Sequence, residues 1–298
     1  MSETCENNRS EKINDADASS VFFELAATTI AEENETVDYA IHANPQPIIR
    51  IENLCKSFEG LKAVSDVSFE IPRGQITGVI GPNGAGKTTL FNLVTGYLKP
   101  DAGKVYFNGQ DITCKPPYKI AKAGIRRTFQ LVRVFPRLTV LENVLMGYEK
   151  LPGDTLLTGF LGLPKNKQAY KVCEKNARQM IEFVGLSEYA DKAANDLSYG
   201  QQKLVELARA LISEPKALLL DEPLSGLNVI IIEKMLELIR KVKEKGTTVI
   251  IIEHNAEVVK QISDNIVALN FGKFLAEGDP ESVYSNRDVI DSYLGGEI

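Results

Sequence analysis

The chain has 298 residues, of which 44% are hydrophobic and 25% charged, and its formal net charge is −6. This composition is typical of one large or two small globular domains and excludes a fibrous or wholly disordered chain. No apolar run reaches the roughly 18–20 residues that span a bilayer, and the acidic N-terminus lacks the features of a secretory signal. We therefore expect a cytosolic protein that reaches a membrane only through a partner.

The acidity is concentrated at the N-terminus. Residues 1–46 hold ten acidic and two basic side chains, a balance of −8 that leaves +2 for the rest of the chain. This segment has too few apolar residues to fold alone, so we predict a mostly disordered extension with one short helix near Ser20. The nearly neutral remainder gives no electrostatic indication of nucleic-acid binding. Four scattered cysteines without a C-x-x-C pair indicate reduced thiols.

The first folded part, from residue 47 on, combines strands with one helix. The pair Asn108-Gly109 predicts a hairpin turn, and a helix follows a glycine-rich loop. The predicted strands cover 48–53, 67–71, 75–80 and 104–107, and the predicted helix covers 88–95.

The middle of the chain, about 140–194, has a different pattern. Apolar residues such as Leu141, Val144 and Leu145 recur at helical spacing, and Gly and Pro interrupt the pattern between 152 and 164. This predicts a helical insert.

The last part alternates between helices and short apolar strands. We predict helices over 201–212 and 233–245, and strands over 217–220, 247–252 and 266–269. Such alternation is typical of a parallel sheet that is buried on both faces, hence of an α/β fold. Residues 279–298 are expected to form a short helical tail.

A phosphate-binding pattern follows the strand at 75–80. The segment Gly81-Pro82-Asn83-Gly84-Ala85-Gly86-Lys87-Thr88 fits G-x-x-x-x-G-K-S/T. Glycines let the backbone N–H groups approach an anion at the start of a helix, where Lys87 would reach the β- and γ-phosphates and Thr88 would bind Mg²⁺. A plain glycine-rich turn is the alternative, but the flanking strand and helix favour nucleotide binding.

Two adjacent acids end the strand at 217–220. A buried strand that runs into Asp221-Glu222 needs a partner for the charge. A bound Mg²⁺ would supply one: Asp221 would hold the metal through water, and Glu222 would polarise the attacking water. The alternative is a solvated acidic loop, which the upstream phosphate loop makes less attractive.

The segment Leu197-Ser198-Tyr199-Gly200-Gln201-Gln202 resembles the L-S-G-G-Q signature of ABC-type ATPases. The order of phosphate loop, Gln130, signature, Asp221-Glu222 and His254 also resembles that of the ABC nucleotide-binding domain, over about 48–278. The resemblance implies a P-loop ABC-type fold over 47–298: a RecA-like parallel core sheet, an antiparallel β subdomain and a helical subdomain at about 131–196.

The resemblance also implies roles for single residues. Glu222, His254 and Gln130 would be catalytic, with His254 at the γ-phosphate and Gln130 sensing Mg²⁺, and Thr88, Gln130 and Asp221 would hold the metal. Phe58 would stack on adenine. The plain alternatives are a surface glutamine, a surface histidine and a core phenylalanine. The nucleotide-binding residues are then Phe58, Gly81, Pro82, Asn83, Gly84, Ala85, Gly86, Lys87, Thr88 and Thr89.

In the family, two domains pair head to tail, and each signature closes on the partner's ATP. Ser198, Gly200 and Gln201 would form that second anion site at the N-terminus of a helix that begins near Gln201. Ser198 as a simple helix cap is the alternative, and both roles are compatible.

A narrower resemblance concerns the subfamily. Arg127-Thr128-Phe129-Gln130, the segment 138–144 and Gly226-Leu227-Asn228 look like the ATPase subunits of branched-chain amino-acid importers. Tyr199, Asn228 and Asn255 depart from the usual Gly, Asp and Asp, and Val229 stands where Pro is common.

The resemblance implies transmembrane permease subunits, a second ATPase subunit and, indirectly, an external binding protein as partners, on the inner face of the membrane. An exporter or lipid-extraction ATPase, a soluble ABC protein acting on ribosomes or DNA, and a non-catalytic binding module are the competing functions.

Overall fold

The computed structural model describes residues 46–149 and 164–294, and the following account concerns these residues. The predicted N-terminal extension with its helix near Ser20, and most of the segment between 152 and 164, lie outside them. Among the described residues, no helix is both long enough and apolar enough to cross a membrane.

The N-terminal part of the described residues forms a four-stranded antiparallel sheet in the order β2-β1-β4-β5. Its strands are β1 (Ile49–Phe58), β2 (Leu61–Ile71), β4 (Ala102–Phe107) and β5 (Gln110–Asp111). β1 and β2 are both longer than predicted. Register shifts interrupt their pairing, and Asn53 and Asp66 have positive φ angles of 46° and 55°. Such irregularities break the alternation of apolar and polar residues by which a strand is recognised in a sequence.

The second sheet has six strands in the order β10-β9-β3-β8-β7-β6. These are β3 (Ile76–Ile80), β6 (Ile125–Arg127), β7 (Ala217–Asp221), β8 (Thr248–Ile252), β9 (Asn265–Asn270) and β10 (Lys273–Gly278). All neighbours pair in parallel except β9 and β10, which form an antiparallel hairpin at one edge. The prediction of a parallel sheet is confirmed, and the edge strands β6 and β10 are additions to it.

The parallel strands separate two hydrophobic cores because successive side chains point to opposite faces of a sheet. The first core includes the helices α4, α6, α7 and α8, and the strand residues Leu218, Leu220, Val249 and Ile251 belong to it. Their neighbours in sequence, such as Leu219 and Ile250, belong to the core that includes β1, β2 and the helix after β3. Burial of every residue of β3, β7 and β8 explains their continuous apolar runs.

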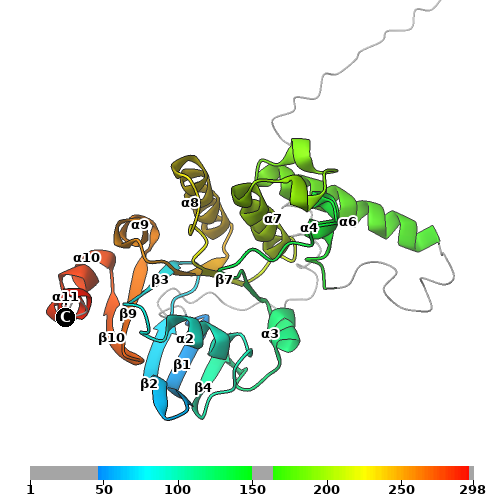
Figure 1. Ribbon diagram of the computed structural model, residues 1–298. Coiled ribbons are helices and arrows are strands. Elements are labelled where there is room, and N and C mark those ends of the chain that lie inside the picture. Colours follow the sequence, from blue (N-terminus) through cyan, green and yellow to red (C-terminus); the bar gives the residue numbers. More distant parts are fainter. Residues whose placement is uncertain (1–45, 150–163, 295–298) are drawn as a thin grey trace, which may run out of the picture. The chain divides into compact units, whose positions relative to one another are not determined.

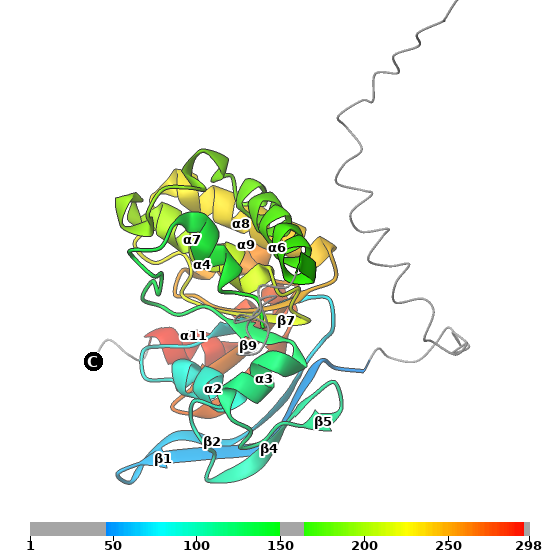
Figure 2. The same cartoon turned by 90° about the vertical axis from the view of Figure 1, so that its right-hand side faces the viewer.

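The helices fall into three groups, of which the first, α2 and α3, packs on the core that includes β1 and β2 (Figures 1 and 2). α4, α6 and α7 contact one another and share the first core with α8. α9 and α10 pack on the β9–β10 hairpin. The helices are α2 (Lys87–Val94), α3 (Pro117–Ala123), α4 (Val140–Leu145), α6 (Pro164–Phe183), α7 (Tyr199–Leu211), α8 (Val229–Glu244), α9 (Ala256–Ile262), α10 (Pro280–Ser285) and α11 (Arg287–Leu294), with 3-10 turns at Ser187–Tyr189 and Ala194–Asp196.

Helices α7 and α8 begin at least two residues before their predicted starts, and a capping residue precedes each of them. α8 begins at Val229 rather than Glu233 because the Asn228 side chain accepts a hydrogen bond from the N–H of Ile231 at 3.0 Å. α7 begins at Tyr199 rather than Gln201, so Gly200 lies inside its first turn and does not precede it. Side-chain acceptors of this kind satisfy the N–H groups that a helix start leaves free.

Candidate active site

Four neighbouring strands of the parallel sheet bring the predicted site residues together. In the order β3, β8, β7 and β6, the segments that follow them carry Lys87, His254, Glu222 and Gln130. The carboxyl ends of parallel strands meet at one edge of the sheet, which is where α/β proteins bind their ligands. Residues far apart in the sequence therefore converge on one place.

Two glycines of the loop after β3 lie so close to the neighbouring backbone that no side chain fits there. Gly81 and Gly86 have φ angles of 148° and 97°, and a Cβ on them would lie 2.2 Å from the Leu269 carbonyl and 2.3 Å from the Ala63 carbonyl. At Gly84, by contrast, a Cβ would meet no atom within 4 Å. The loop is therefore pressed against β2 and β9 on one side and open at Gly84, as a phosphate cradle must be.

Lys87 is the first residue of α2 and is buried, at 6% exposure. Its ammonium group donates to the carbonyl oxygens of Gly81 at 2.6 Å and Pro82 at 3.0 Å. Burial lowers the pKa of Lys87, and the nearby carboxylates of Glu222 and Asp221 oppose that shift. A cation thus lies between the loop and the two acids. Thr88 is exposed and Thr89 is half-buried at the start of the same helix.

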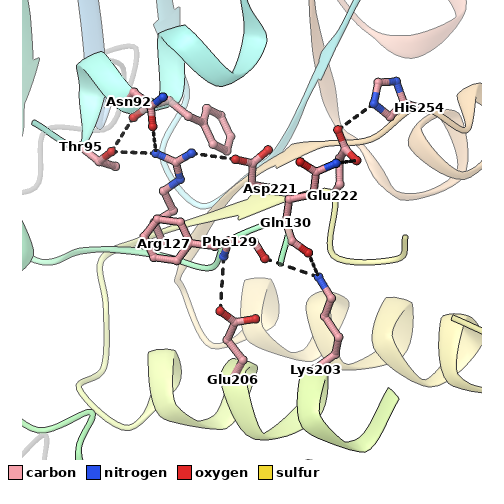
Figure 3. A network of polar contacts seen from close by, with 11 residues as sticks. Asn92, Thr95, Arg127, Phe129, Gln130, Lys203, Glu206, Asp221, Glu222 and His254 are labelled. Atoms are coloured by element: carbon pink, nitrogen blue, oxygen red, sulfur yellow. Dashed lines mark hydrogen bonds and ion pairs between the residues drawn. The ribbon is translucent and has the colours of Figure 1, made fainter. Parts of the chain in front are cut away.

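Glu222 joins the other two predicted catalytic residues (Figure 3). One carboxylate oxygen accepts a hydrogen bond from Nε2 of Gln130 at 2.7 Å, and the other lies 2.7 Å from Nε2 of His254. The Glu222 side chain is 12% exposed, whereas that of His254 is 46% exposed. A carboxylate that is held on both sides and only slightly exposed to solvent is well placed to orient a single water molecule.

The backbone at Glu222 is in the left-handed region, with φ 49°. Its N–H donates to the Ile252 carbonyl of β8 at 2.9 Å, which anchors the turn that leaves β7. Non-glycine residues adopt this conformation at an energetic cost and gather at functional sites. In this conformation the Glu222 side chain contacts Gln130 and His254.

Asp221 has an ion-pair partner for which the sequence predicted no role. Arg127 of β6 pairs with Asp221 at 2.7 Å, and both side chains are nearly buried. The same guanidinium donates to Asn92 at 2.7 Å and Thr95 at 3.2 Å on α2, and lies over the ring of Phe129. Arg127 therefore connects the helix of the phosphate loop, the acid of β7 and the segment that carries Gln130.

The signature residues lie at the start of α7. Ser198 and Gln201 form a capping box, in which each side chain accepts a hydrogen bond from the other residue's N–H. Within the described residues, no hydrogen bond or ion pair joins Ser198 to Lys87, Glu222 or His254. Phe58, at the end of β1, is 42% exposed, with the Lys56 ammonium 5.6 Å from its ring.

The departures at Tyr199, Asn228 and Asn255 have structural explanations. The Tyr199 ring packs on Gly226, where an added Cβ would lie 3.3 Å from it. Asn228 and Asn255 are the N-caps of α8 and α9. Asparagine and aspartate are about equally good at this position, so the helix starts are preserved.

Sequence reasoning missed three further buried polar residues at this edge. Glu253 accepts hydrogen bonds from the N–H groups of Leu224 at 2.8 Å and His254 at 3.3 Å. Lys203 and Glu206 of α7 contact the segment that carries Gln130. Burial raises the pKa of Glu253 and Glu206 and lowers that of Lys203. The available signal was a charged side chain on the otherwise apolar face of a helix or at the end of an apolar strand.

Comparisons with known proteins agree with this geometry. The profile of the ABC transporter family matches residues 64–225. The high-affinity branched-chain amino acid transport ATP-binding protein BraF of Pseudomonas aeruginosa is 40% identical over 251 residues, which cover 84% of this chain and 98% of that protein. LivG of Escherichia coli, a protein with the same description, is also 40% identical over 251 residues, with the same coverage. The probable branched-chain amino acid transport ATP-binding protein LivG of Archaeoglobus fulgidus is 40% identical over 250 residues, 84% of this chain and 96% of that protein.

The chain belongs to the ABC transporter family. It is an ATPase subunit of that family and has the P-loop ABC fold that the order of its motifs implied. Family membership implies nucleotide binding, permease subunits as partners and pairing of two cassettes.

Solved structures of ABC cassettes support the fold. A nucleotide-free ATP-binding cassette from an ABC transporter is 38% identical, with a TM-score of 0.72 over 83% of this chain and 99% of that chain. A cassette in its ADP conformation is 38% identical with the same TM-score, over 84% of this chain and 99% of that chain. A dimeric cassette in a post-hydrolysis state, bound to ADP and phosphate, is 27% identical with a TM-score of 0.64, over 78% and 98%.

Proposed function

We propose that this ABC ATPase powers the import of branched-chain or closely related amino acids. The contact of Gln130, Glu222 and His254 beside the phosphate loop supports ATP hydrolysis. The relatives that match across more than four fifths of the chain carry the names of branched-chain amino acid transport proteins. Those names favour import over export and over a role on ribosomes or DNA.

In the proposed mechanism, the backbone N–H groups of residues 83–89 and the Lys87 ammonium bind the triphosphate, and Phe58 stacks on adenine. Glu222 orients the attacking water, while Gln130 and His254 hold its carboxylate in place. His254 is also proposed to contact the γ-phosphate. Preorganised groups of this kind stabilise the charge that develops on the transferred phosphoryl group.

Asp221, Thr88 and Gln130 fit a magnesium site. They provide the carboxylate, hydroxyl and amide oxygens that Mg²⁺ prefers, and they lie at the same edge of the sheet, next to the buried Lys87. When bound, the ion neutralises phosphate charge. Arg127 pairs with one carboxylate oxygen of Asp221 at 2.7 Å, which fixes the orientation of the carboxylate.

Ser198, Gly200 and Gln201 are proposed to contact the nucleotide of a second cassette. The N-terminus of α7 offers backbone N–H groups and a hydroxyl to an anion. A second subunit, either a sister chain or a copy of this one, would bring its phosphate loop to this helix end. Closure of the pair excludes water from both sites and completes them.

A groove of about 430 Å³ is the proposed docking site for a permease helix on the inner face of the membrane. Its walls come from α3, β6, the end of α4 and α7, next to the segment that carries Gln130. Tyr118 and Met146 are 69% and 52% exposed at its rim. Four cationic and two acidic side chains line it, which favours a permease helix with apolar and acidic residues; they are Lys122, Arg126, Arg127, Arg209, Glu149 and Glu206. An external binding protein would deliver the amino acid to that permease.

The deciding experiment compares the wild-type chain with Glu222→Gln. The amide retains the size of the side chain but is a poor base, so ATP turnover should fall roughly 10²–10⁴-fold while ATP affinity is retained. The variant should accumulate as an ATP-bound dimer in size-exclusion chromatography. Glu237→Gln on α8, which removes one exposed ion pair with Lys241, is the matched control. Normal turnover by Glu222→Gln would contradict the assigned role.

The experiment that tests the proposed substrate requires the whole transporter. The chain is purified with its permease subunits, reconstituted in vesicles with ATP on its own side, and supplied with the binding protein and radiolabelled leucine on the other. ATP-dependent uptake with the wild type and none with Glu222→Gln is expected. Leucine movement in the opposite direction, or uptake independent of branched-chain amino acids, would refute the proposal.

A further inference from the structure

The signature helix α7 holds the backbone of the segment that carries Gln130 (Figure 3). The Lys203 ammonium donates to the carbonyl oxygen of Gln130 at 2.8 Å and to that of Phe129 at 3.4 Å. One turn further along α7, the Glu206 carboxylate accepts a hydrogen bond from the N–H of Phe129 at 3.4 Å. A cation thus binds the carbonyl groups and an anion binds the N–H group of the same short segment.

These two charged side chains are almost completely buried. Lys203 and Glu206 are each 3% exposed, and their neighbours on the helix, such as Leu204 and Leu207, are core residues. Two apolar side chains of similar volume would fill the same space without the desolvation penalty of buried charges. What the charged pair adds is directional contact with the backbone of Phe129 and Gln130.

The segment of Phe129 and Gln130 also contacts the carboxylate of Glu222. The side chain of Gln130 donates to Glu222 at 2.7 Å, while its backbone carbonyl is the acceptor for Lys203. Gln130 therefore cannot move relative to α7 without losing the Lys203 contact, and cannot move relative to β7 without losing the Glu222 contact. A single residue joins the two elements.

The other end of this connection is the N-terminus of α7. Ser198 caps the helix on which Lys203 and Glu206 lie, and a helix transmits displacement along its axis as a rigid body. Glu206 also lines the groove between α3, α4 and α7. Events at Ser198 or in the groove therefore reach Gln130 through the same helix.

We propose that Lys203 and Glu206 are positioning residues, which place Gln130 against Glu222 only when α7 is seated on that segment. The inference rests on the proposed roles of Gln130 and Glu222. It assigns to α7 a function within its own subunit, besides the one toward the partner's nucleotide: hydrolysis at a site depends on the seating of that subunit's own signature helix.

The test uses Lys203→Met, which retains the length of the side chain but cannot donate a hydrogen bond, and Lys203→Arg, which can. Outer partners of a metal or catalytic ligand typically contribute 10–100-fold to activity. For Lys203→Met we expect a fall in kcat of roughly tenfold or more, unchanged ATP affinity by equilibrium fluorescence titration, and a melting temperature close to that of the wild type. Lys203→Arg should recover most of the kcat.

The matched control is Lys234→Met on α8. Lys234 also donates to a backbone carbonyl, that of Gly185 at 3.3 Å, away from the strand edge that carries the site. Its kcat and ATP affinity should equal those of the wild type. Glu206→Gln is measured in parallel and should lower kcat without changing ATP affinity, so that an unstable Lys203→Met protein would still leave the proposal open to refutation.

A double-mutant cycle shows whether Lys203 acts through Gln130. In a Gln130→Ala background, Lys203→Met should cause no further loss of kcat. Additive losses, or a kcat for both Lys203→Met and Glu206→Gln within twofold of the wild type, would overturn the proposal. Failure of the proposed function is distinguishable, because it would appear as normal turnover by Glu222→Gln.

Discussion

At the scale of single residues, the site depends on a few buried charges that would be costly without their partners. Lys87 is enclosed by the glycine-rich loop and faces two carboxylates. Arg127 neutralises Asp221 at 2.7 Å. Charges in such surroundings interact more strongly than in water, and removing one leaves the other unpaired.

The Lys87 ammonium should dominate nucleotide affinity. Lys87→Ala removes a buried cation that would contact the β- and γ-phosphates, and it also frees the carbonyl groups of Gly81 and Pro82. Truncation of a buried, hydrogen-bonded charge commonly costs several kcal/mol, so affinity for ATP should fall roughly 10²-fold or more by calorimetry. Lys99→Ala, at an exposed lysine shortly after α2, is the control, and unchanged affinity in Lys87→Ala would contradict the phosphate-loop assignment.

Glu253 should make stability depend on pH. Burial raises its pKa above the ordinary value, so the folded state retains a proton that the unfolded state has lost. Ionisation of Glu253 therefore destabilises the fold as pH rises from the ordinary glutamate pKa through the raised value.

Glu253→Gln removes this dependence because the amide never ionises. The melting temperature of the variant relative to that of the wild type should rise as the pH increases from the ordinary glutamate pKa through the raised value. Glu206 and Glu277, whose pKa values are also raised, are present in both proteins and cancel in the comparison. A difference in melting temperature that stays constant or declines with pH would contradict the prediction.

At the scale of elements, helix starts are the decisive features. Ser198 and Thr139 both open a helix with a capping box, at α7 and α4 respectively. Only α7 carries the signature, so the same local device has an added proposed role there. The two caps therefore allow the contribution of capping to be separated from nucleotide contact.

Ser198→Ala and Thr139→Ala should each lower the free energy of unfolding by about 1 kcal/mol, because each removes a capping acceptor. In a Glu222→Gln background, only Ser198→Ala should also weaken the ATP-dependent dimer in size-exclusion chromatography. Ser198→Asp retains a capping acceptor but places negative charge beside the partner's phosphates, so it should melt like the parent protein and fail to dimerise. Equal dimerisation of Ser198→Asp and the parent would place Ser198 away from the partner's nucleotide.

At the scale of the whole molecule, two residues connect the candidate active site with the groove. Arg127 of β6 both pairs with Asp221 and lines the groove, and Glu206 both holds the Phe129 backbone and lines the same groove. A partner seated there would contact side chains whose other atoms contact the catalytic edge.

Tyr118→Asp should therefore disrupt the complex with the permease. The residue is 69% exposed on α3 at the groove rim, and a charge in an apolar contact commonly costs enough to weaken an interface on the order of tenfold or more. The yield of permease subunits that co-purify with the tagged chain from detergent-solubilised membranes is the measurement. Tyr170→Asp on α6, 42% exposed, is the control; equal yields from both variants would exclude the groove as the docking site.

The local features of this protein could be predicted from neighbouring residues in the sequence. The continuous apolar runs of β3, β7 and β8 predicted a sheet buried on both faces, and the spacing of Gly81, Gly86 and Lys87 predicted the phosphate loop. These are properties of neighbouring residues, so periodicity and backbone sterics are sufficient to recognise them. The strand before Gln130 and the edge strand β10 were not recognised, because three residues or an exposed edge carry little apolar signal.

The contacts between residues that are distant in the sequence could not be predicted in this way. Arg127 and Asp221 are 94 positions apart, Lys203 and the Gln130 carbonyl are 73 apart, and Glu253 and Leu224 are 29 apart. The strand order β3-β8-β7-β6 and the packing of α7 bring these pairs together. A charged residue inside an apolar run shows that a partner is needed, but the identity of that partner depends on the folded arrangement of the whole sheet.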